Sequence, residues 1–123
     1  MNDKVVSEVV KTAMSLALMA FSAFMRIMAD EVENTEPEND KFDSFLRVSL
    51  DHTNAMEKLE ETMLMHRPEH LTVNGCIAIL LDMSRVVEIE KETGHVLDLD
   101  IENSYLKIKD ALDMTMGMVL ERS

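Results

Sequence analysis

Residues 5–28 read VVSEVVKTAMSLALMAFSAFMRIM, a stretch with neither glycine nor proline. Alanine, methionine and leucine dominate its centre, and these residues lose little side-chain freedom in a helix. No residue from Thr12 to Met25 is charged, so apolar side chains point in nearly every direction. A helix that is apolar all round has to be buried on most sides. We therefore expect the rest of the chain, or a second copy of it, to surround this segment.

A membrane span is the alternative for this segment. The uncharged run covers 14 residues, whereas a bilayer requires roughly 20. Lys11 and Arg26 limit the run at its two ends, and Asp3 and Glu8 are out of place in the basic leader of a signal peptide. The pattern favours a core or interface helix.

The composition indicates one soluble domain over residues 1–123. Methionine is abundant, with 12 copies, and aromatic residues make up only 4% of the chain, which indicates an adaptable core. Three glycines and two prolines leave room for few tight turns. The single cysteine, Cys76, cannot form an internal disulfide, which favours a reducing, cytoplasmic location. It lies in an apolar run and is expected to be an inert core thiol.

Working outward, the spacing of apolar residues predicts three more helices. Pro37 and Pro68 separate the first three segments, and Gly94 is expected to end the third helix. Asp3 and Thr72 are the expected caps of the first and third helices. The predicted helices span residues 4–33, 41–66, 73–93 and 101–121. Short links between them favour an all-α, antiparallel up-and-down four-helix bundle. A rival interpretation is a β-hairpin within residues 86–101, where polar and apolar residues alternate around Thr93 and Gly94.

The predicted first helix is the longest, at about 45 Å for 30 residues. We expect it to extend beyond the third helix and to pack on another protomer or on a partner. The expected oligomer interface consists of Phe21, Phe24, Met25 and Met28.

The net charge of −12 is concentrated in two stretches. Residues 30–43 hold seven acids and one base, and residues 88–102 hold six acids and one base. In an up-and-down bundle the first and third connections lie at the same end, so both stretches should meet there. Such an acidic end attracts basic surfaces, although it can also be merely solvated. The partner-binding residues predicted on this basis are Asp30, Glu31, Glu33, Glu36, Glu38, Asp40, Glu90, Glu92, Asp98 and Asp100.

A few acidic residues suggest metal chemistry instead. Glu57, Glu60 and Glu61 lie on adjacent turns of the second helix, and Asp82 could face them from the third. This arrangement resembles the MazG-type helical nucleotide pyrophosphatases, in which paired Glu and Asp residues on neighbouring helices hold magnesium at a triphosphate. The resemblance implies a metal-dependent nucleotide hydrolase. The chain departs from that pattern because the second acidic motif contains only Asp82 and no basic cluster lies nearby to grip phosphates.

Other classes of site find no support in the sequence. There is no glycine-rich phosphate loop and no glycine-flanked serine, so we expect no catalytic residue and no cofactor. The histidines lack a second ligand pair at metal-binding spacing, and His52 is expected to be a half-buried packing residue with one hydrogen bond. Direct binding to nucleic acid or to anionic membranes is disfavoured by the negative charge.

The sequence therefore favours a non-enzymatic, acidic helical binding protein. It would inhibit or chaperone a partner with a basic, nucleic-acid-binding surface. By analogy, such a protein suits phage counter-defence, of the anti-CRISPR or anti-restriction kind, or toxin immunity. The alternatives are the nucleotide pyrophosphatase and a purely structural homo-oligomer.

Overall fold

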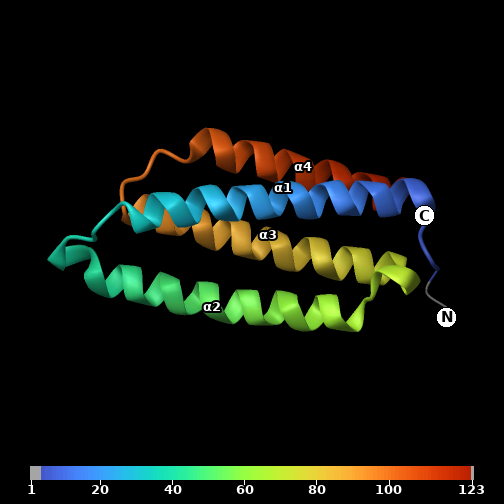
Figure 1. Cartoon of the computed structure of the whole chain (residues 1–123), viewed down its shortest axis with the longest axis horizontal. Helices are drawn as coiled ribbons and strands as arrows, with labels where there is room; N and C mark the ends of the chain where they lie inside the picture. The colour runs from blue at the N-terminus through green and yellow to red at the C-terminus, as the bar shows by residue number, and fades with distance from the viewer. Residues whose placement is uncertain (1–3, 123) are drawn as a thin grey trace.

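The computed structural model describes residues 4–122 and confirms the all-α four-helix bundle. Its long helices are α1 (Glu8–Glu33), α2 (Phe42–Met65), α3 (Val73–Val96) and α4 (Glu102–Arg122), and short 3-10 turns η1 (Asn39–Lys41) and η2 (Pro68–His70) precede α2 and α3. The four rods run up and down (Figure 1). The α1–α2 and α3–α4 connections lie at one end, whereas the chain termini and the α2–α3 link lie at the other.

The start of α1 differs from the prediction. The helix begins at Glu8, and its cap is Ser7, whose side chain accepts a hydrogen bond from the backbone N–H of Val10. The predicted cap, Asp3, lies outside the described residues. The segment before the helix is extended because it pairs with the α2–α3 link: the N–H of Val6 donates to the carbonyl of Leu71. Thr72 caps α3 as predicted, accepting from the N–H of Gly75 at 3.1 Å.

The end of α3 corrects the prediction more substantially. Gly94 does not end the helix but lies buried inside its last turn, which continues to Val96. A Cβ atom at this position would lie 2.6 Å from Cδ1 of Ile101, so glycine is needed here for a close approach. The left-handed residue just after the helix is Asp98, with a φ of 55°. Aspartate tolerates this conformation better than most residues. The hairpin alternative is wrong, because residues 86–96 are helical.

Helix packing leaves one seam of the bundle open. α3 packs along both α2 and α4, and α1 packs along α4, whereas α1 and α2 make little close backbone contact. The core stripe of α1 follows a 4-3-4-3-4 spacing and consists of Val10, Met14, Ala17, Phe21, Phe24 and Met28. Cys76 is fully buried in the same core.

The expected overhang of the first helix is wrong, because α1 has 26 residues and α3 has 24. Phe21, Phe24 and Met28 are buried in the chain's own core, and Met25 lines a pocket. The reason for expecting these four residues at an oligomer interface therefore fails.

α1 is also the one helix among the described residues that is long and apolar enough to cross a membrane by length and composition. About a third of its apolar window, 33%, is buried inside the bundle. The core helix of a soluble protein meets the same criteria.

Candidate functional site

The acidic end of the molecule is formed by the two connections that Figure 1 shows side by side. Two ion pairs tie these stretches to their neighbours. Lys41, just before α2, pairs with Asp98, just after α3, and Arg47 pairs with Glu92 at 3.5 Å. The hydrogen bond with Lys41 lowers the pKa of Asp98, and the same bond raises the pKa of Lys41. The two acidic stretches thus lie at one end of the bundle.

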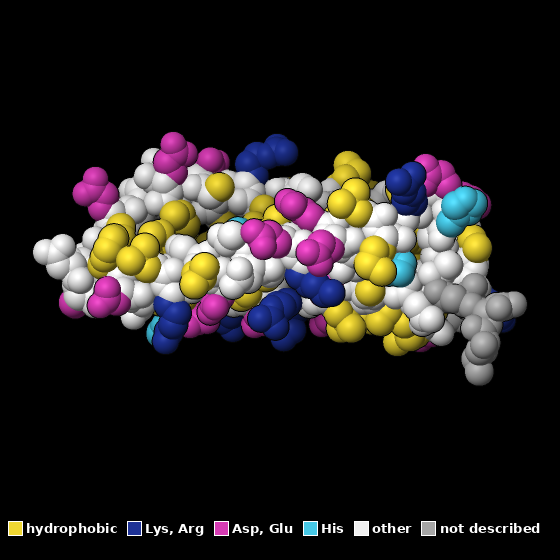
Figure 2. Space-filling view, turned by 90° about the horizontal axis from the view of Figure 1, so that it is seen from below, with side chains coloured by type: hydrophobic (Ala, Val, Ile, Leu, Met, Phe, Trp, Pro, Cys, Tyr) yellow, Lys and Arg dark blue, Asp and Glu magenta, His cyan; other side chains and the backbone are white. Residues whose placement is uncertain are grey.

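Most carboxylates at this end form no ion pair with a basic side chain of the described residues. Among the described residues no ion pair engages Asp30, Glu31, Glu33, Glu36, Glu38, Asp40 or Asp100, and all seven are exposed. Acidic side chains surround this end in the space-filling view (Figure 2). Like charges that are close together and unpaired raise the negative potential beyond the surface. We call the first six of these residues, Asp30 to Asp40, the acidic rim.

Glu90 does not belong to this surface, although the sequence placed it there. It is buried on the core side of α3, and its side chain is only 9% exposed. The signal was present in the sequence: Glu90 continues the buried spacing of Met83 and Val87. A charged residue at such a position requires a partner, because an unpaired buried charge is costly.

The partner of Glu90 is His52, and together they face a pocket of about 270 Å³ between α1 and α2. Nε2 of His52 lies 2.6 Å from Oε1 of Glu90. This nitrogen is buried, and among the described residues it makes no hydrogen bond of good geometry, so the contact with Glu90 is a close approach of the two groups. His52, predicted to be a half-buried packing residue, is therefore one half of a carboxylate–imidazole pair.

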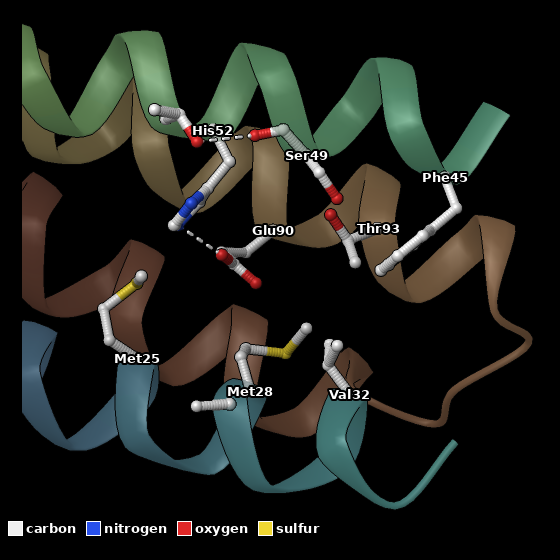
Figure 3. A pocket seen from close by; sticks show the side chains of 10 residues that line it. Met25, Met28, Val32, Phe45, Ser49, His52, Glu90 and Thr93 are labelled. Atoms are coloured by element: carbon white, nitrogen blue, oxygen red, sulfur yellow. Dashed lines mark hydrogen bonds and ion pairs between the residues drawn. The ribbon is translucent and has the colours of Figure 1, made fainter. Parts of the chain in front are cut away.

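The remaining walls of the pocket are mostly apolar. Figure 3 shows side chains from α1 facing the His52–Glu90 pair across the cavity, with Phe45 closing the side nearest the acidic end. Figure 2 shows the hollow on the surface near the same end. The wall residues include Met25, Met28, Val32, Phe45 and Thr93. Because methionine is flexible and polarizable, such a wall can adapt to apolar groups of different shapes.

A second pocket lies farther along the open seam. It measures about 170 Å³ and lies near the end that carries the termini. Met14 and Leu18 of α1, Met63 of α2 and Ile79 of α3 contribute to its lining. The weak contact between α1 and α2 thus leaves two apolar hollows along one seam of the bundle.

The metal candidates do not come together. Glu57, Glu60 and Glu61 are exposed on α2, and Asp82 on α3 accepts a hydrogen bond of 2.5 Å from the hydroxyl of Thr62. Within residues 4–122 no group of three or more His, Cys, Asp or Glu side chains is placed to hold a metal ion. The structure therefore offers no geometric support for the resemblance to the pyrophosphatases.

Beside the acidic end, Tyr105 of α4 links two helices. Its hydroxyl donates to Oε1 of Glu88 on α3 at 2.5 Å, and the ammonium of Lys91 lies 4.2 Å from the centre of its ring. The hydrogen bond to Glu88, together with burial, raises the pKa of Tyr105 to about 12. These contacts hold the starting turn of α4 against the end of α3, next to the acidic rim.

No protein-family model, curated protein or solved structure matches this chain. The arrangement of the site itself therefore carries the functional argument.

Proposed function

We propose that this chain is a non-enzymatic binding protein that inhibits or chaperones a partner with a basic, nucleic-acid-binding surface, and that it acts in the cytoplasm. The observation that carries the proposal is the acidic rim: six exposed carboxylates gathered at one end, none of them in an ion pair within residues 4–122. Lys41 is near enough to Glu38 and Asp40 to interact with them, but it is paired with Asp98. Basic proteins would be steered toward this end, because opposite charges accelerate association. Such a protein would serve phage counter-defence or toxin immunity by covering a groove that normally binds nucleic acid.

Apolar surface next to the rim supports the same function. Phe42, Leu46 and Leu50 recur every four residues on α2 and are exposed, and Phe45 opens into the pocket beside them. Charge gives orientation and speed of association, whereas buried apolar contacts give most of the affinity at an interface. The proposed partner therefore places basic residues on the rim and an apolar side chain in the His52–Glu90 pocket.

The test compares two variants with equal changes in charge. The rim variant replaces Asp30 and Asp40 with Asn and Glu31, Glu33, Glu36 and Glu38 with Gln. The control variant changes six exposed acids away from the rim in the same way: Asp51, Glu57, Glu60, Glu61, Asp110 and Asp113. Immobilised wild type and both variants are incubated with cell lysate at roughly 50 mM and 500 mM salt, because screening shortens the reach of charge. Captured proteins are identified by mass spectrometry.

We expect the wild type and the control variant to retain the same basic protein at low salt and to release it at high salt. The rim variant should bind it at least about tenfold more weakly. Adding the purified chain should also block the nucleic-acid binding of that protein. The proposal fails if the two variants lose the partner equally, since net charge alone would then explain capture. It also fails if the captured protein still binds nucleic acid in the complex.

A further inference from the structure

α1 carries a second apolar stripe on a face that the bundle covers only in part: Ala13 and Ala20 are half-buried, and the other four members are exposed. The stripe repeats the 4-3-4-3-4 spacing of the core stripe, shifted by one residue, and no member is polar. Its members are Val9, Ala13, Leu16, Ala20, Ala23 and Ile27. The large residues protrude: Leu16 is 60% exposed. A regular stripe of this spacing is what a helix presents to another helix.

α4 extends this stripe into a broader apolar surface. Met114 is among the most exposed apolar residues of α4, and Ala111 and Met118 share its helical face. Between the two helices lies a hollow of about 220 Å³ lined by Ala20, Ala23 and Ile27, among others. Ser104 and Lys107 of α4 also line this hollow, so polar residues border the apolar surface there. Exposed apolar patches with a polar border mark sites of interaction with other proteins or with membranes.

The order of residues in the stripe identifies the partner. We propose that a second copy of the chain packs on this face, with the two α1 helices antiparallel about a two-fold axis. An axis level with position 18 sets Leu16 of each copy opposite Ala20 of the other. The same axis pairs Val9 with Ile27. Large residues thus meet small ones at the centre, and the partner's Leu16 fits over the hollow beside Ala20, as self-complementary two-fold interfaces require.

Charge also favours the antiparallel arrangement. On one flank of the stripe Glu8 and Arg26 lie at opposite ends, so the two-fold axis brings Glu8 of each copy near Arg26 of the other. The Glu8 side chain is 89% exposed, and its ion pair with Lys11 lies on the surface. A parallel pair would instead set the two acidic ends side by side, with like charges in register.

The proposed interface leaves the acidic site free. Leu18 and Met25 line the pockets of the open seam, and they lie across the core stripe of α1 from Leu16 and Ala20. The dimer is therefore independent of the proposed function, and each can fail without the other.

The test measures molar mass in solution by light scattering and sedimentation velocity, over a range of protein concentration. Leu16→Glu disrupts the proposed interface. Leu50→Glu is the matched control, because Leu50 is 62% exposed on α2, away from the stripe. Both substitutions are at exposed positions, and thermal unfolding checks that the bundle remains intact. We expect wild type and Leu50→Glu to dimerise and Leu16→Glu to raise the dimer dissociation constant at least tenfold.

Charge reversal tests the orientation. Glu8→Arg alone or Arg26→Glu alone should weaken the dimer, and the double variant should restore it, because the exchanged charges again face their opposites. In a parallel dimer Glu8 of one copy and Arg26 of the other would lie at opposite ends of the interface, too far apart to pair, and the double variant would not restore binding. A monomeric wild type overturns the proposal, as does a dimer that Leu50→Glu disrupts more than Leu16→Glu. A monomer that cosediments with uncharged lipid vesicles through Leu16 would assign the face to a membrane instead.

Discussion

The His52–Glu90 pair provides the sharpest test of the site's energetics. His52→Leu places an apolar side chain against the pocket and leaves the Glu90 carboxylate without its partner. Removing one member of a fully buried pair costs about 3–5 kcal/mol. Here the Glu90 side chain is 9% exposed but that of His52 is 29% exposed, and the pocket admits water. We therefore expect a smaller loss of stability, about 2–3 kcal/mol at neutral pH.

The double variant His52→Leu/Glu90→Met separates the pair from the packing around it. It replaces both polar groups with apolar ones, and such replacements are often neutral or stabilising. We expect its free energy of unfolding to lie within about 1 kcal/mol of wild type, which gives a coupling energy of about 2 kcal/mol in a double-mutant cycle. Urea denaturation measures the two single variants, His52→Leu and Glu90→Met, and the double variant. Costs that simply add, with coupling below about 0.5 kcal/mol, would refute the argument that the two groups stabilise each other.

Further predictions concern the α3–α4 junction and α4. The folded chain holds the Tyr105 proton up to a pH of about 12, whereas the unfolded chain loses it near 10. The contribution of Tyr105 to the free energy of unfolding is thus complete below pH 10 and is lost between pH 10 and 12. We expect the loss to be about 1–2 kcal/mol, because solvent screens the exposed Glu88. Alkaline unfolding should show this loss, and Tyr105→Phe should remove it. Gly94→Ala should cost about 1 kcal/mol net, because crowding of Ile101 outweighs the gain in helix propensity. Gly117→Ala, with open space around the new Cβ, should gain about 0.5–1 kcal/mol in thermal unfolding; equal effects at the two glycines would contradict the assigned contacts.

The helices could be predicted from the sequence because their signals are local. Proline positions, the Thr72 cap and the spacing of apolar residues depend on neighbours along the chain, and these placed four helices to within a few residues. Gly94 was misinterpreted because a glycine near a helix end usually supplies a left-handed turn. Here its role is set by Ile101 on another element, and no local pattern reveals a contact of that kind.

Interfaces between helices were harder to predict for the same reason. The apolar character of residues 5–28 showed that α1 must be covered on several sides, but not which side the chain covers itself. The sequence predicts an oligomer interface at Phe21 and Phe24, whereas the fold buries them and exposes Leu16 and Met19. The open α1–α2 seam depends on the relative placement of whole helices. The pocket at that seam therefore appears only in three dimensions. The position of Glu90 within a buried stripe does indicate, from the sequence alone, that this carboxylate needs a partner.

The proposed dimer and the proposed acidic site have a joint consequence. An antiparallel pair would carry its two acidic rims at opposite ends, so one dimer could engage two partner molecules. Linked sites raise apparent affinity for a dense surface without any new contact, by about 10²–10⁴-fold when the geometry permits both to bind. Leu16→Glu should therefore leave affinity for a partner in solution unchanged and lower retention on a surface densely coated with the same partner.

Surface binding at high and low partner density would measure this difference, with Leu64→Glu as the control, because Leu64 is 73% exposed near the end of α2 that is remote from the rim. Equal retention of Leu16→Glu and wild type at both densities would show that the rims act singly. A loss of solution affinity in Leu16→Glu would instead mean that the partner contacts the stripe on α1 itself, since that position lies outside the rim and the seam pockets. We expect neither of these two results. The core stripe of α1 separates the face that would meet a second copy from the face that opens toward α2, so Leu16→Glu should change dimerisation without changing the partner site.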